Sequence, residues 1–63
     1  MKSMIENYHN GNLTAARKQA KRHSHAAIRA ALQETLGYSL NKAALTADYL
    51  KTGEGFQAAC DAV

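Results

Sequence analysis

The sequence predicts an all-α fold, a compact bundle of three to four helices, and three observations support this prediction. Alanine, which favours the helix more than any other residue, is the most frequent residue in the chain. Proline is absent and only four glycines occur among the 63 residues, so helix-breaking residues are scarce. Apolar residues recur at helical spacing, and no stretch shows the strict alternation of a strand. The length predicts a single domain over residues 1–63.

The first predicted helix is short and runs from Met4 to about His9. Ser3 and Glu6 have the S-x-x-E spacing of a capping box, in which the hydroxyl accepts from an early backbone N–H and the carboxylate reaches back. Gly11 is expected to end this helix, because glycine readily takes the left-handed conformation that closes a helical turn.

The second predicted helix is long, from about residue 13 to 36, with Asn12 as its N-cap. Its apolar stripe consists of Leu13, Ala16, Ala20, Ala27, Ile28, Ala31, Thr35 and Leu36. The weakest stretch is His-Ser-His at 23–25, because serine competes for backbone hydrogen bonds, and a break or kink is expected there first. Gly37 is expected to close the helix.

The third predicted helix runs from about residue 39 to 51, is capped by Ser39 and packs on the long helix. Its expected buried face consists of Leu40, Ala44, Ala47 and Leu50, flanked by Ala43, Leu45 and Tyr49. A turn at residues 52–55 leads to a short last helix, where Glu54 suits the helix start. Its apolar positions are Phe56, Ala59, Cys60 and Val63.

The predicted core is thin. A domain of this size buries only about 60% of its unfolded surface, and small domains normally need a disulfide, a metal, very good packing or a partner chain. Cys60 is the only cysteine, which excludes a disulfide within the chain and fits a reducing compartment. A homodimer that completes the core is therefore one hypothesis. We expect Cys60 to be packed rather than redox-active, because Asp61 beside it disfavours the thiolate.

The chain has neither a signal-peptide pattern nor a membrane span. The first residues include one lysine but lack the apolar run of a secretory signal. No stretch approaches the roughly 20 apolar residues that cross a bilayer. The sequence therefore predicts no membrane partner and a cytoplasmic location.

Charge is distributed unevenly along the chain. Residues 1–32 contain six basic and one acidic side chain, whereas residues 33–63 contain two basic and four acidic ones. The candidate interaction face on the long helix consists of Arg17, Lys18, Lys21, Arg22, His25 and Arg29. Three interpretations stay open: a solvated face that keeps the protein in solution, a docking face for an acidic protein, and a nucleic-acid face. No aromatic residue lies between these cations in the sequence, and this absence disfavours the interpretation as a nucleic-acid face.

A helix-turn-helix can be drawn from Arg29 to Ala47, with Gly37 in the turn. Its second helix would enter the major groove and offers Asn41 and Lys42, but it contains no arginine. Because Asp48 on the same helix would repel phosphate, the sequence disfavours base recognition by this helix.

The sequence predicts neither metal binding nor catalysis. His9, His23 and His25 are candidate ligands, but His23 and His25 are two residues apart, so on a helix they point to different sides. Cys60 is remote in sequence and has no CxxC partner. There is no glycine-rich phosphate loop, no nucleophile motif and no obvious pair of carboxylates. We therefore expect no cofactor, no catalytic residue and no enzymatic activity.

Two adjoining stretches, GNLTAARKQAKRHSHAAIRAAL and QETLGYSLNKAALTADYLKTGEGFQAACDA, cover residues 11–62. They resemble a family of small early proteins of lambdoid bacteriophages, the open-reading-frame products encoded between the exonuclease and excisionase genes. The likeness extends over nearly the whole chain, and the length matches. It includes no mechanistic motif, so it implies no site residue.

The resemblance implies a phage early protein that influences the lysis–lysogeny balance, prophage induction and the host cell cycle. It implies no enzymatic activity and names no molecular target. Together with the charge pattern, it predicts a non-catalytic regulator that binds an unidentified host or phage protein in the host cytoplasm. The alternative is a nucleic-acid-binding accessory protein that uses the same basic face.

Overall fold

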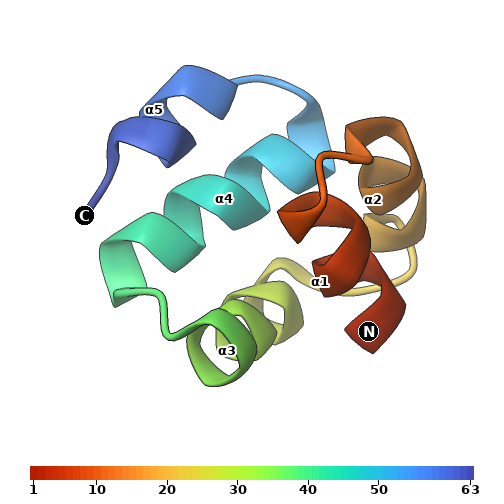
Figure 1. Cartoon of the computed structure of the whole chain (residues 1–63), viewed down its shortest axis with the longest axis horizontal. Coiled ribbons are helices and arrows are strands. Elements are labelled where there is room, and N and C mark those ends of the chain that lie inside the picture. The colour runs from red at the N-terminus through yellow and green to blue at the C-terminus, as the bar shows by residue number, and fades with distance from the viewer.

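The computed structural model describes all residues, 1–63, as five helices without a strand. The helices are α1 Lys2–His9, α2 Leu13–Ala20, α3 His25–Leu36, α4 Leu40–Thr52 and α5 Phe56–Asp61. They form a globule of 24 × 22 × 20 Å, with α4 between α5 and α3 (Figure 1). The prediction of an all-α fold is confirmed. The predicted number of three to four helices is wrong, because the long second helix is two helices.

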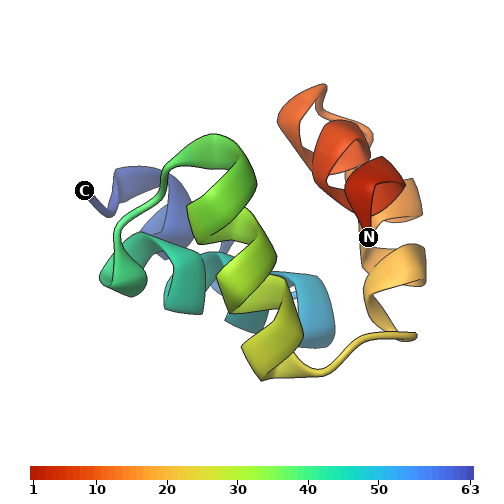
Figure 2. The same ribbon diagram turned by 90° about the horizontal axis from the view of Figure 1, so that it is seen from below.

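The break between α2 and α3 lies at residues 21–24, which overlap the stretch 23–25 where a break was expected first. Ser24 leaves the helical conformation and caps α3, its Oγ accepting from the backbone N–H of Ala27 at 3.1 Å. Lys51 of α4 holds the end of α2, its Nζ donating to the carbonyls of Ala20 at 3.3 Å and His23 at 2.6 Å. Figure 2 shows α2 and α3 as separate helices joined by this connection.

The first helix begins earlier than predicted, and the capping box does not form. Met1 occupies the N-cap of α1 without a side-chain hydrogen bond, and Ser3 lies inside the helix. The Ser3 hydroxyl instead accepts from Nε2 of Gln19 at 3.0 Å, while Gln19 Oε1 accepts from Nδ2 of Asn7 at 2.8 Å. Tertiary hydrogen bonds between α1 and α2 have thus replaced the local cap.

The connection between α3 and α4 follows the prediction. Gly37 closes α3 in the left-handed conformation, at φ 69°. Ser39 caps α4, its hydroxyl accepting from the backbone N–H of Lys42 at 3.1 Å. Both interactions are local, which is why the sequence alone could place them.

The core gathers side chains from α1, α2, α3 and α4. Its ten buried members are Met4, Ile5, Ala16, Ala20, Ile28, Leu32, Ala43, Ala47, Tyr49 and Leu50. The predicted face of α4 is partly wrong, because Leu40 is 61% exposed and Ala43 and Thr46 are fully buried. The buried face of α4 is broader than one stripe because α2, α3 and α5 all pack against this helix.

The last helix buries little. Of its four predicted apolar positions only Ala59 is buried, whereas Val63 is 96% exposed. Cys60 is exposed, so the prediction of a packed cysteine is wrong. Helix α5 has only six residues and packs mainly against α4, so most of its side chains stay exposed. No helix in the molecule is long and apolar enough to cross a membrane.

Candidate anion-binding surface on α2

One face of α2 is hollowed and basic. Thr14, Arg17, Lys18 and Lys21 line a hollow of about 300 Å³, which we call the α2 basic hollow. Their spacing of three and four residues places them on one side of the helix. The opposite side buries Ala16 and Ala20 in the core, so packing of α2 forces the basic side chains outward.

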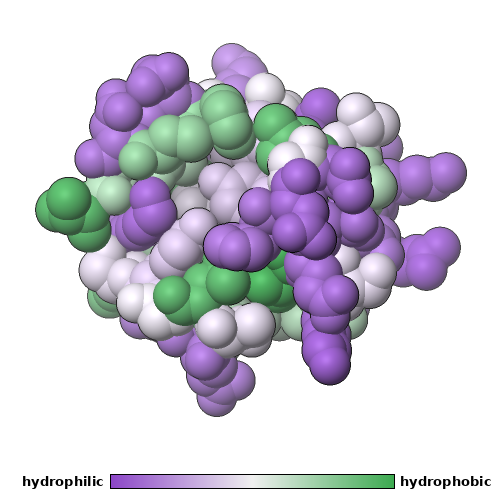
Figure 3. Space-filling view, in the orientation of Figure 1, coloured by the Kyte–Doolittle hydropathy of each residue, from purple (hydrophilic) through white to green (hydrophobic).

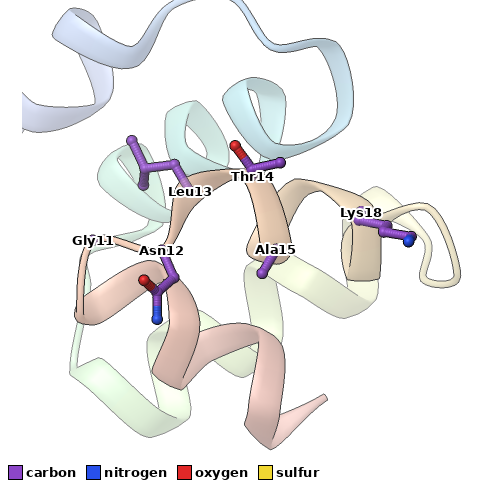
Figure 4. Close-up of a pocket in the computed structure, with 6 residues that line it drawn as sticks. All are labelled: Gly11, Asn12, Leu13, Thr14, Ala15 and Lys18. Carbon is purple, nitrogen blue, oxygen red and sulfur yellow. The ribbon is translucent and has the colours of Figure 1, made fainter.

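A second hollow adjoins the first at the start of α2. It has a volume of about 490 Å³ and is lined by Gly11, Asn12, Leu13, Thr14, Ala15 and Lys18 (Figure 4). Thr14 and Lys18 belong to both hollows, so the concave surface continues along α2. Figure 3 shows hydrophilic side chains, in purple, projecting on the side of α1 and α2. Part of the surface along α5 is pale green and therefore hydrophobic.

Arg17 is held in place by α4 and the turn that follows it. Its Cζ lies 5.9 Å from the centre of the Tyr49 ring, within the range of a cation–π contact. Its guanidinium also lies against Gly53, where an added Cβ would overlap Nη2 and Cζ. Nε is buried without a hydrogen bond, and the terminal nitrogens form no ion pair with a carboxylate of the protein. Arg17 therefore presents a fixed guanidinium rather than a freely moving one.

The cations of the α2 basic hollow are not neutralised by the protein's own carboxylates. The only contact within salt-bridge distance in the molecule joins His25 of α3 to Asp48 of α4, with Nε2 and Oδ1 2.6 Å apart, and it is an ion pair only where His25 is protonated. Arg17, Lys18 and Lys21 therefore have no carboxylate within ion-pair distance. Their charge is free to act on an external anion.

The predicted interaction face is divided by the break after α2. Arg17, Lys18 and Lys21 are brought together, whereas Arg22 lies exposed in the connection to α3. His25 is engaged with Asp48. Arg29 is half-buried on α3, with Nε buried and unpaired. The prediction that these residues share one long helix is therefore wrong, and their role in binding stays a prediction.

Two lysines outside that face have structural roles that the sequence did not reveal. Lys42 Nζ donates to the carbonyls of Ala59 at 2.9 Å, Cys60 at 3.3 Å and Ala62 at 3.1 Å, at the end of α5. Lys51 does the same at the end of α2. An ammonium is favourable at a helix C-terminus because the last carbonyls lack partners and the helix dipole is negative there.

These contacts bear on the helix-turn-helix interpretation. Helices α3 and α4 do form a pair with a short turn, but Lys42 is engaged with α5 rather than free for phosphate. Asp48 is exposed on α4. Recognition of a DNA groove by α4 therefore has less support than the sequence alone suggested.

Two tyrosines are perturbed by burial. Burial raises the pKa of Tyr8 above its ordinary value of 10.0, while the Thr46 hydroxyl opposes this effect without making a well-formed hydrogen bond. Burial also raises the pKa of Tyr38, with a smaller contribution from Cys60. Both phenols are thus neutral at physiological pH and add no charge to the surface.

No three His, Cys, Asp or Glu side chains lie close enough together to hold a metal ion. Comparison with protein-family models, with curated proteins and with solved structures finds no match to this chain.

Proposed function

We propose that this chain is a non-catalytic binding protein that docks its α2 basic hollow onto an acidic surface of another protein. The observation behind the proposal is the gathering of Arg17, Lys18 and Lys21 around one hollow with no carboxylate paired to them. Unpaired like charges on one face repel one another, and an anionic partner would relieve that repulsion.

Arg17 favours a docking surface over a merely solvated face. A cation that only maintains solubility needs no fixed position, and long surface side chains usually keep their rotamer freedom. Arg17 has lost that freedom, because it packs on Tyr49 and against Gly53. A fixed guanidinium binds an oxyanion with a smaller entropic cost than a mobile one.

The alternative is an accessory protein that binds nucleic acid with the same cations. Duplex DNA presents one negative charge per about 1.7 Å of axis, so it favours proteins with long basic tracks. The break after α2 shortens the track here, and His25 is engaged with Asp48. Protein docking therefore has the stronger support.

We further propose that this docking serves phage development. The support is the resemblance of residues 11–62 to the small early proteins of lambdoid bacteriophages. On this view the chain is a regulator in the host cytoplasm that takes part in host takeover. By binding a host or phage protein it influences the lysis–lysogeny balance, prophage induction or the host cell cycle.

The test compares two labelled polyanions, an acidic polypeptide and a generic DNA duplex, by fluorescence anisotropy across a salt series. We expect the polypeptide to bind, and the variant R17E/K21E to lose that binding. K2E changes an exposed charge outside the hollow and is the matched control. Tighter binding of duplex DNA than of polypeptide would favour the alternative, and binding of neither at low salt would refute docking.

A further inference from the structure

We propose that the α2 basic hollow accepts an acidic helical segment of its partner, with one carboxylate bound bidentately by Arg17. The proposal rests on the proposed function and specifies the partner group that the hollow recognises. It makes Arg17 the specificity-determining residue, with Tyr49 and Gly53 as the residues that position it.

The orientation of Arg17 leaves one way for a carboxylate to approach. The centre of the Tyr49 ring lies 5.9 Å from Cζ on one side, and Gly53 lies against Nη2 and Cζ. Nε is buried, so the side of the guanidinium that contains Nε is closed to a ligand. The terminal nitrogens remain, and a planar guanidinium can donate two parallel hydrogen bonds from them to the two oxygens of a carboxylate.

Gly53 keeps this arrangement free of steric conflict. It ends α4 at φ 82°, in the left-handed region that glycine enters without cost. The missing side chain leaves the space that the guanidinium occupies. The same glycine therefore closes the helix and makes room for Arg17.

The spacing of the cations along α2 matches that of carboxylates on another helix. Arg17 and Lys21 are four residues apart, which corresponds to a rise of about 6 Å along the axis. Glutamates at positions i and i+4 of a partner helix share this separation and lie on one face. Thr14 and Lys18 at the edges of the hollow are exposed and add a hydroxyl donor and a third positive charge.

The experiment uses two labelled helical peptides of identical composition. One has glutamates at i, i+4 and i+7 on a single face, and the other has the same glutamates distributed around the helix. We expect the full-length protein to bind the one-face peptide about tenfold more tightly, because only that peptide engages Arg17 and Lys21 together. Equal affinity for the two peptides would overturn the proposal.

The variant R17K keeps the charge but removes the bidentate geometry. We expect it to lose about tenfold in affinity for the one-face peptide and little for the distributed one. K2R makes the same kind of exchange at an exposed residue outside the hollow, so it is the matched control and should bind as the unmodified protein does. Circular dichroism and thermal melting establish that each variant is folded.

A second variant keeps the proposal testable if R17K fails to fold. K21Q changes an exposed side chain and should reduce the preference for the one-face peptide, whereas K2Q should not. If R17K and K21Q both keep the unmodified protein's preference for the one-face peptide, the hollow does not recognise an acidic helical segment. Docking onto an acidic surface would still stand. Binding of neither peptide by the unmodified protein would refute docking itself. Tighter binding of a phosphorylated peptide would overturn the choice of carboxylate.

Discussion

Lys51 shows how one side chain joins distant parts of this chain. Its ammonium contacts the carbonyls of Ala20 and His23, which are 31 and 28 residues away in sequence. The contact lies at the point where α2 ends and the connection to α3 begins. Nothing in the local sequence around Lys51 indicates such a partner, so only the folded structure reveals it.

Replacing Lys51 by methionine should lower the free energy of unfolding by about 1 kcal/mol, since the carbonyls at the end of α2 lose their cation. Urea denaturation followed by circular dichroism measures the change. Lys2 is exposed at the start of α1, and Lys2→Met should leave the midpoint unchanged. Equal stability of the two variants would show that the Lys51 contact does not stabilise the fold.

The raised pKa of Tyr8 predicts that the folded chain loses stability in alkali. Its pKa is raised in the folded chain, so above pH 10 the unfolded chain ionises first and binds fewer protons than the folded one. The stability that depends on the neutral phenol is therefore complete below pH 10 and declines as the pH rises through the folded-state value. Tyr8→Phe should make the unfolding free energy decline less steeply above pH 10 in urea titrations. An unchanged slope would contradict this role.

At the scale of elements, local signals predicted the helix ends and failed where tertiary contacts compete. Gly37 and Ser39 close α3 and cap α4 as expected, because each acts within its own turn. Ser3 was expected to cap a helix but instead binds Gln19 of α2. The exposed position of Leu40 depends on how neighbouring helices surround α4, which periodicity does not encode.

The same distinction applies to the candidate site. Sequence placed Arg17, Lys18 and Lys21 on one helix face, and they do line one hollow. It did not foresee that Tyr49 and Gly53 hold Arg17, since these residues lie more than 30 positions away. No pattern in a single sequence reports such a contact.

Ser24→Ala tests whether the break after α2 is set by the cap. The substitution removes the hydrogen bond to Ala27 and should cost about 1 kcal/mol of stability. Ser39→Ala removes the equivalent cap of α4 and is the matched comparison. A gain in helix content and stability for Ser24→Ala alone would mean that a continuous helix over residues 13–36 is the preferred state.

The whole molecule has a small core and an apolar surface at its C-terminal end. Ten residues form the core, and much of it is alanine. Leu40 and Val63 are exposed, and Phe56 is 40% exposed although its ring lies 5.0 Å from that of Tyr49. Such a core supports only modest stability in a single chain, so association of two chains is a hypothesis that stability measurements can test.

We expect a cooperative thermal transition with a free energy of unfolding of at most about 3–5 kcal/mol, which a core this small rarely exceeds, and with the same value at all protein concentrations. Calorimetry over a hundredfold concentration range, with light scattering for molar mass, measures both quantities. A melting temperature that rises with concentration, together with a doubled mass, would establish a homodimer.

We infer that an acidic partner binds at the α2 basic hollow. The most direct test is a titration of the isotope-labelled protein with the one-face acidic peptide, followed through its backbone amide resonances. We predict that the largest shifts fall on Thr14, Arg17, Lys18 and Lys21 and on Gly53, which contacts Arg17. Shifts confined to α5 and the exposed C-terminal end, with none on α2, would place the binding site elsewhere.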